Sequence, residues 1–309
     1  MQAQEVLDLP VIPAMTTDAE RECYYRLARE GAADGAVVEL GAWLGASSSY
    51  IAAAMRDSTG GKAHIYDRFV SKRGHADKVK AFFADRATSK PIPLGPAFEQ
   101  FKANLGPLMA YVEPHKGEIA KIDWRDGPIS VLITDAPKRV PEISAVLTRL
   151  RKALRPGAIM AWQDFCHFPS YEIAACLYRI REHLEFAEAV VPGTTLVFRV
   201  KEQWGEAEVS REELALDRWT AEEVAEAWDY WLQFVPAEKA ALFRCGAAMF
   251  LCDIGHPLDA AASLAEVLAV DPEAVMPKWR YLREKRPDFV TRYAALFQLT
   301  EAALVTLIA

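Results

Sequence analysis

The sequence predicts an α/β fold with a doubly wound, mostly parallel sheet, followed by an all-helical C-terminal region. Strand-like and helical segments alternate as far as about residue 200, and strands that alternate with helices form parallel sheets. Beyond residue 211 every apolar pattern has helical spacing. The polar stretch 201–211 lies between the two parts, and we expect the domain boundary there.

Local patterns define the elements of the first part. Thr17 and Glu20 form a capping box that opens an amphipathic helix reaching Gly31. The apolar run AVVEL then begins the first strand. In chain order we expect strand 36–41, a helix from Ser47, strands 63–67, near 110–113 and 129–134, helix 140–154, strand 158–162 and helix 170–183. Two further β-rich runs, 186–191 and 194–200, flank Pro192-Gly193 and are predicted to form a hairpin at one sheet edge.

The predicted domains are an N-terminal helical segment 1–35, a main domain 36–200 and a helical domain 211–309. The long connection 68–108 is either a lid or one or two ordinary surface helices. Residues 247–274 are typical of one tetratricopeptide-type unit, and a generic helical pair explains them too. The helical domain carries four tryptophans that either mediate self-association or a partner contact, or pack this domain against the first: Trp219, Trp228, Trp231 and Trp279.

Composition narrows the class of protein. Of the 309 residues, 51% are hydrophobic and 26% are charged, which is typical of a globular protein. No apolar run approaches the roughly 18 residues of a spanning helix, and the first residues lack a signal-peptide pattern. The net charge of −7 is dispersed, so we expect no nucleic-acid surface. The five cysteines lack ligand spacing, which predicts a reducing, cytoplasmic location.

The first strand leads into the loop ELGAWLGASS at residues 39–48, and a helix follows at once. Gly41 and Gly45 permit a tight turn and close approach of a ligand to the backbone. The helix N-terminus offers free N–H groups to a carboxylate or phosphate. Asp67 ends the next strand, 22 positions after Gly45, where an acid can accept hydrogen bonds from ribose hydroxyls. NAD and S-adenosylmethionine both contain that ribose, and a plain strand-to-helix turn is the alternative.

The loop ELGAWLGASS resembles the first motif of class I S-adenosylmethionine-dependent methyltransferases, a Rossmann-like family, and IYD at 65–67 resembles the second. The similarity is closest to macrocin and related O-methyltransferases of sugars and natural products, and it covers roughly residues 14–200. The resemblance implies that the cofactor's methionine part lies near Glu39, Gly41 and Gly45, its carboxylate near Ser47 and Ser48, its ribose on Asp67 and its adenine near Glu118.

Polar residues also follow two later strands. Asp135 comes after strand 129–134, and Gln163 and Asp164 come after strand 158–162. Because these strand ends meet beside the crevice of an open parallel sheet, their oxygens are candidate ligands for Mg²⁺. Such a cation would lower the pKa of an acceptor hydroxyl. The alternative is that one of the acids caps the following helix.

Asp135-Ala-Pro-Lys138 resembles the Asp-x-x-Lys of catechol-type methyltransferases and the Asp-x-x-His of macrolide-sugar ones, which implies that the fourth residue takes the acceptor proton. Lys138 would be a general base if a nearby cation and burial depress its pKa. His167 is the second candidate base. Gln163 stands where the family usually has an acid, so a metal-free reaction stays open.

The leading hypothesis is an S-adenosylmethionine-dependent O-methyltransferase that acts on a hydroxyl of a sugar, glycan or natural product. An NAD-dependent oxidoreductase is the second hypothesis, although it leaves Asp135, Lys138 and Asp164 without a role. The third is a non-catalytic methyltransferase-like scaffold with a helical docking domain. We further expect a small-molecule or glycan partner, no membrane contact, and homo-oligomer formation through the helical domain.

Overall fold

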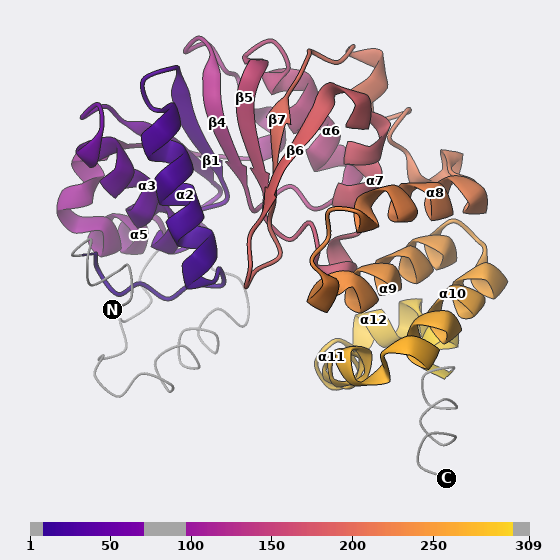
Figure 1. Cartoon of the computed structure of the whole chain (residues 1–309). Helices are drawn as coiled ribbons and strands as arrows, with labels where there is room; N and C mark the ends of the chain where they lie inside the picture. Colours follow the sequence, from indigo (N-terminus) through magenta and orange to yellow (C-terminus); the bar gives the residue numbers. More distant parts are fainter. Residues whose placement is uncertain (1–8, 71–96, 299–309) are drawn as a thin grey trace.

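The computed structural model describes residues 9–70 and 97–298, and within them seven strands form one sheet with helices on both faces (Figure 1). The strands are β1 (Ala36–Leu40), β2 (Ala63–Asp67), β3 (Val112–Lys116), β4 (Ile129–Thr134), β5 (Leu154–Trp162), β6 (Leu184–Ala189) and β7 (Leu196–Val200). The α-helices are α2 (Asp18–Gly31), α3 (Ala46–Asp57), α5 (Ala97–Leu105), α6 (Val140–Leu150), α7 (Glu172–Arg179), α8 (Ala221–Leu232), α9 (Ala237–Asp253), α10 (Pro257–Val270), α11 (Pro272–Lys285) and α12 (Pro287–Arg292).

The strand order is β3-β2-β1-β4-β5-β7-β6. Strands β1 to β5 run parallel to one another, whereas β7 is antiparallel to both β5 and β6. The chain builds outward from β1 in one direction and then returns to start again at β4, so the order reverses between these two strands. In an open α/β sheet, that reversal places a ligand crevice at the carboxyl ends of the strands.

Each face of the sheet is buried, because successive strand side chains point to opposite sides. In β4, Val131 and Ile133 belong to the core shared with α2, α3 and α5, whereas Leu132 belongs to the core shared with α6 and α7. The helices therefore cover the sheet as two layers, which Figure 1 shows on either side of the central strands. The predicted doubly wound fold is confirmed.

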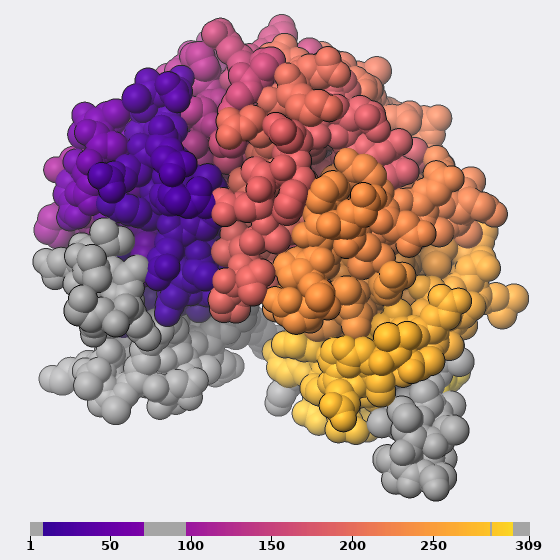
Figure 2. All heavy atoms as spheres, viewed as in Figure 1, coloured from indigo at the N-terminus to yellow at the C-terminus, as the bar shows by residue number. Residues whose placement is uncertain are grey.

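The helical region is continuous with one of these cores. Trp231 of α8 donates a hydrogen bond from its indole Nε1 to the carbonyl of Ala174 in α7 (2.9 Å). Its ring lies 5.0 Å from that of Phe165 and 5.5 Å from that of Phe198 on β7. In the space-filling view, the β6–β7 hairpin lies directly between α2 and these helices (Figure 2). The division into domains near residue 201 stays a prediction.

The tryptophans predicted as interface anchors lie inside the protein. Their exposed fractions are 4% for Trp219, 3% for Trp228, 1% for Trp231 and 2% for Trp279. The proposal that they mediate association is therefore wrong, because large aromatic side chains stabilise cores as well as interfaces. Homo-oligomer formation through this region stays a prediction without that support.

Most predicted elements have their predicted type. The predicted capping box of Thr17 and Glu20 is present, and a second one, formed by Thr220 and Glu223, begins α8. The strand expected near 110–113 begins at Val112, two residues later, and the edge hairpin is β6–β7. The lid predicted within 68–108 falls largely on 71–96, outside the described residues. Among the helices of the described part, none has both the length and the apolar character needed to cross a bilayer.

Candidate active site

Four loops of the site begin at the same level of the sheet. Leu40 of β1 pairs with Tyr66 of β2 on one side and with Thr134 of β4 on the other. Thr134 in turn pairs with Trp162 of β5. These four paired residues form a row across the sheet. Because the strands are parallel, the residue that follows each of them lies at the carboxyl edge of the sheet, where the strand order reverses. The residues that follow this row are Gly41, Asp67, Asp135 and Gln163.

A cavity of about 540 Å³ lies at this edge, within the range of small-molecule sites. Trp43 and Phe69 contribute aromatic walls from the first two loops, and Arg286 reaches it from the helical region. Of the residues predicted from the sequence, its lining contains Gly41, Asp67, Glu118, Asp135 and Lys138. The predicted residues that the described lining does not contain are Glu39, Gly45, Ser47, Ser48, Gln163, Asp164 and His167.

The two glycines of the first loop have different reasons to be glycine. Both have a left-handed backbone, with φ of 99° at Gly41 and 94° at Gly45. A Cβ on Gly41 would lie 2.9 Å from the backbone nitrogen of Ala136, in the loop after β4. A Cβ on Gly45 would lie 2.4 Å from Leu105, at the end of α5. Both glycines are packed against protein, but only Gly41 of the two is among the residues that line the cavity, so the expected close approach of a ligand concerns Gly41.

Backbone strain is concentrated around the same edge. In the part of the chain that the structure describes, the non-glycine residues with positive φ are Trp43 (47°), Phe69 (49°) and Asp164 (63°). Each such residue costs of the order of 1–3 kcal/mol and persists where its surroundings hold it in place. Two of the three line the cavity.

Glu39 is buried in β1, with 1% of its surface exposed. The hydroxyls of Ser47 and Ser48, in the first turn of α3, both donate to its carboxylate. Burial raises the pKa of Glu39 to about 8, although the two serine hydrogen bonds act in the opposite direction. The structure thus brings these three predicted residues together, with the serines satisfying the glutamate.

Asp67 holds two loops together. Its Oδ2 accepts hydrogen bonds from the backbone nitrogens of Ala42 (2.9 Å) and Trp43 (3.0 Å). Its Oδ1 accepts one from the nitrogen of Phe69 (2.5 Å). A carboxylate has about four lone-pair positions, so about one is left for a ligand hydroxyl. Asp67 therefore shapes the cavity wall in addition to the ribose contact predicted from the sequence.

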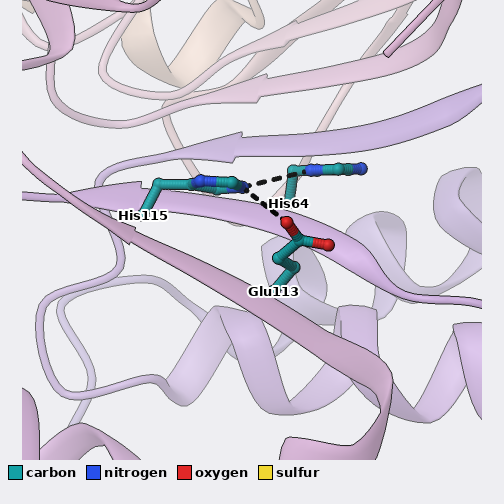
Figure 3. A group of neighbouring side chains, drawn as sticks. All are labelled: His64, Glu113 and His115. Atoms are coloured by element: carbon teal, nitrogen blue, oxygen red, sulfur yellow. Dashed lines mark hydrogen bonds and ion pairs between the residues drawn. The ribbon is translucent and has the colours of Figure 1, made fainter.

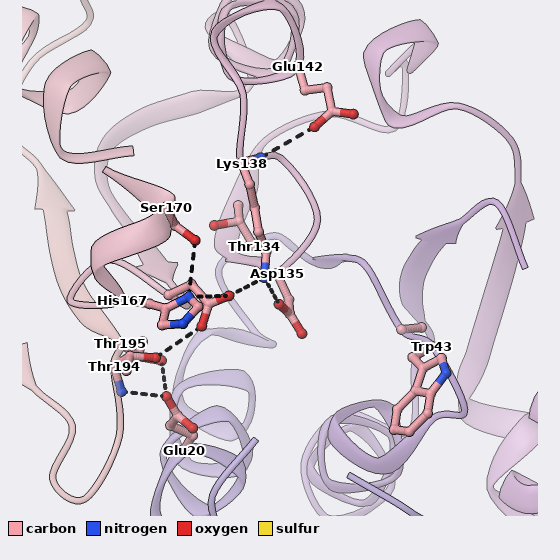
Figure 4. A network of polar contacts seen from close by, with 12 residues as sticks. Glu20, Trp43, Thr134, Asp135, Lys138, Glu142, His167, Ser170, Thr194 and Thr195 are labelled. Carbon is pink, nitrogen blue, oxygen red and sulfur yellow. Dashed lines mark hydrogen bonds and ion pairs between the residues drawn. The ribbon is translucent and has the colours of Figure 1, made fainter. Parts of the chain in front are cut away.

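Lys138 lies between two carboxylates from different strands (Figure 4). Its ammonium Nζ donates to Asp135 Oδ1 at 3.1 Å and also to Asp164 Oδ2. Asp164 additionally accepts from the hydroxyl of Thr194 at 3.3 Å. His167 Nδ1 is 3.8 Å from Asp164 Oδ2 and 3.3 Å from the hydroxyl of Ser170. The chemical groups at this end are one ammonium, two carboxylates and one imidazole.

The ionisation of this group differs from the prediction. Burial lowers the pKa of Lys138, but Asp135 and Asp164 together outweigh burial and raise it above its ordinary value. The expected depressed lysine pKa is therefore wrong, because the carboxylates of Asp135 and Asp164 contact the ammonium and favour its charged form. Burial raises the pKa of Asp135 to about 6, against the opposing effect of Lys138.

The pKa values of Asp164 and His167 are both shifted downward. Burial raises the pKa of Asp164, but Lys138 and His167 outweigh it, so the net shift is downward. Burial lowers the pKa of His167, which keeps the imidazole neutral near pH 7. Asp164 is therefore ionised beside a neutral imidazole whose side chain is 47% exposed.

The residues predicted to hold Mg²⁺ do not fit the ion in this arrangement. The Lys138 ammonium lies between the Asp135 and Asp164 oxygens and already compensates their charge. Gln163 is 5% exposed, and its Oε1 is buried with no hydrogen-bond partner in the described structure. No contact of Gln163 with the two acids is found among these residues. The metal prediction therefore receives no support.

Three residues that the sequence did not assign to the site, Glu20, Thr194 and Thr195, support this end of it. Glu20 is buried and accepts hydrogen bonds from the backbone of Thr194 (2.9 Å) and the hydroxyl of Thr195 (2.8 Å). Thr194 then contacts Asp164. The capping box identified Glu20 as a local residue only, because its contacts to the hairpin span more than 170 positions of sequence.

Comparison with known proteins identifies the family of the central part of the chain. Residues 38–165 match the family described as "Methyltransferase domain". This part of the chain is a methyltransferase domain. It begins in β1 and ends just after β5, so it contains Gly41, Asp67, Asp135 and Gln163 but not His167.

Solved structures that resemble this chain have low sequence identity to it. They include the O-methyltransferase NovP, at 16% identity and a TM-score of 0.46, covering 62% of this chain and 84% of that one. The calicheamicin methyltransferase CalS11 has 16% identity and a TM-score of 0.42, with coverages of 58% and 77%. An rRNA methylase from Streptococcus thermophilus has 11% identity and a TM-score of 0.39, with coverages of 63% and 100%. No curated protein matches the sequence.

The family match confirms the resemblance to S-adenosylmethionine-dependent methyltransferases and implies this methyl donor. It also favours the methyltransferase hypothesis over an NAD-dependent oxidoreductase. The lining of the cavity includes Asp67 and Glu118, which are predicted for the donor, and Asp135 and Lys138, which are predicted for the acceptor. Different residues of the same cavity are therefore available to the methyl donor and to the acceptor.

We expect Glu39 to make the stability of the domain depend on pH. The folded carboxyl, with a pKa of about 8 against an ordinary 4.5, keeps a proton that the unfolded chain releases. Stability from this residue is therefore lost as pH rises from 4.5 to 8, by up to about 1.4 kcal/mol per unit. Urea unfolding should show that Glu39→Gln gains stability relative to the wild type over this range. Glu22→Gln, at an exposed position of α2, is the control. Parallel pH profiles for wild type and Glu39→Gln would contradict the assignment.

Proposed function

We propose that the protein transfers a methyl group from S-adenosylmethionine to a hydroxyl of a small polyhydroxylated acceptor, such as a sugar, a glycan or a natural product. The observation that carries this proposal is the methyltransferase match over residues 38–165 together with one cavity lined by both Asp67 and Lys138.

The residues that we assign to the donor lie around the first two loops. Asp67 and Glu118 would contact its ribose and adenine, and Gly41, which lines the cavity, would lie beside the methionine part. The hydrogen bonds from Ser47 and Ser48 to the buried Glu39 hold the first loop in place. Gly45 keeps that loop against α5. S-adenosylmethionine supplies the electrophilic methyl group when bound.

The residues that we assign to the acceptor lie at the other end. His167 is the proton acceptor, because it is neutral and partly exposed beside Asp164. Asp164, held ionised by Lys138, would stabilise the imidazolium that forms on proton transfer. Lys138 is assigned an electrostatic role, since an ammonium near the acceptor oxygen favours its developing negative charge. In this assignment the lysine replaces a divalent cation.

The compartment and the state of association remain proposals. We infer a reducing, cytoplasmic location, which the five free cysteines support. Four of the five cysteines are buried, and their side chains pack in the protein core. A non-catalytic scaffold is the alternative function, and the first experiment distinguishes it from an enzyme.

Methyl transfer is tested with the full chain, S-adenosylmethionine carrying a labelled methyl group, and a panel of nucleotide sugars and glycosylated natural products. The proposal predicts label in an O-methyl ether of one acceptor class. A chain that binds S-adenosylhomocysteine but labels no hydroxyl in this panel or in a cell extract would support the scaffold.

Binding of S-adenosylhomocysteine tests the donor end by calorimetry. Asp67→Ala should weaken binding about tenfold or more, because a hydrogen bond to a charged group contributes about 1.5–3 kcal/mol. Gly41→Val should abolish binding, because its side chain would meet the backbone of Ala136. Asp34→Asn, an exposed change before β1, is the control. Wild-type affinity in both Asp67→Ala and Gly41→Val would contradict the assignment. Tight binding of NAD to the wild type would contradict it as well.

Turnover in chelator tests the acceptor end. We expect unchanged activity in EDTA, because Lys138 occupies the space between the two carboxylates. His167→Ala should lower turnover about 100-fold or more near pH 7, and the loss should shrink as pH rises and hydroxide becomes available. His256→Ala removes an exposed imidazole elsewhere and should have no effect. Loss of activity in EDTA that Mg²⁺ restores would overturn the role given to Lys138.

A further inference from the structure

A second group of polar side chains lies on the sheet, away from the residues of the proposed reaction (Figure 3). His64 lies on β2, and Glu113 and His115 lie on the neighbouring edge strand β3. His64 pairs directly with Glu113, and Tyr66 pairs with His115. Paired residues of parallel strands share a face, so all four side chains project from the same side of the sheet.

The three ligand-type atoms converge. His64 Nδ1 and His115 Nε2 are 3.1 Å apart, and His115 Nε2 is 3.9 Å from Glu113 Oε1. One ligand atom of each residue lies within 4.8 Å of the others. Around tetrahedral zinc, bonds of about 2.0–2.1 Å place neighbouring ligand atoms about 3.3 Å apart. The observed separations are within side-chain adjustment of that arrangement.

We propose that His64, Glu113 and His115 form a binding site for a divalent transition metal ion, with Zn²⁺ as the best match to two imidazoles and one carboxylate. The inference does not depend on the proposed methyl transfer. A fourth ligand is available in Asp126, whose Oδ2 is 4.0 Å from His64 Nδ1, or in water. On binding, the proton that the two facing nitrogens share moves to an outer ring nitrogen, which frees both for the ion.

The surroundings of the two imidazoles favour this use. The Tyr66 ring stacks on His115 with centroids 4.2 Å apart, and the Trp124 ring packs edge-on against His64 at 4.9 Å. These contacts restrict both rings. Glu113 is 52% exposed and gives the ion a path from solvent.

A bound ion would stabilise the position of the edge strand β3. β3 pairs with β2 alone among the described strands, so its position depends on one ladder and on the side chains beside it. His115 is three residues before Glu118, which lines the cavity. The ion would therefore fix the strand from which the adenine end of the cavity continues.

The test uses the metal-free full chain titrated with Zn²⁺ by calorimetry and with Co²⁺ by visible absorption. We expect one ion per chain and a higher Tm with Zn²⁺. His64→Asn and His115→Gln should each weaken binding at least about 100-fold, since even outer partners of a ligand cost 10–100-fold. His256→Ala and Asp135→Asn should bind as the wild type does, which separates this site from surface histidines and from the acids of the cavity.

Circular dichroism and the metal-free Tm establish that each variant is folded. If His64→Asn does not fold, Glu113→Gln at its half-exposed position takes its place and should weaken binding at least about tenfold. Absence of one-to-one binding to the wild type would overturn the proposal. Unchanged binding in both His115→Gln and Glu113→Gln would overturn it equally.

Discussion

The ammonium of Lys138 joins two carboxylates that come from different strands, and the proposed reaction depends on that contact. Asp135 follows β4 and Asp164 follows β5, so the parallel register alone brings two negative charges to one edge. Two half-buried carboxylates that contact the same ammonium need its charge to offset their loss of hydration and their mutual repulsion. Here a residue three positions after Asp135 supplies it, which leaves His167 as the neutral group able to accept a proton.

Contacts from both ends of the described chain support this edge of the sheet. Glu20 of α2 holds the turn between β6 and β7, and Thr194 of that turn contacts Asp164. From the other end, Arg286 reaches the cavity and Trp231 packs the helical region onto β7. The helical region is therefore part of the structure around the site, and its tryptophans are part of the core.

The sequence predicts strands and loop residues well, because a strand buried on both faces must be apolar along its length and a polar residue must follow where it leaves the core. β4 and Asp135 are the clearest case. The sequence does not predict the sign of the Lys138 pKa shift, which depends on a contact across two loops. The strand β3 begins two residues later than expected, and the pairing of His64 with Glu113 depends on that register.

The position of Lys138 is tested most directly by a crystal structure with S-adenosylhomocysteine, grown in manganese chloride and measured at the manganese absorption edge. The account predicts the lysine Nζ between Asp135 and Asp164 and no anomalous density there. A manganese peak bound by both carboxylates, with Lys138 displaced from them, would contradict it.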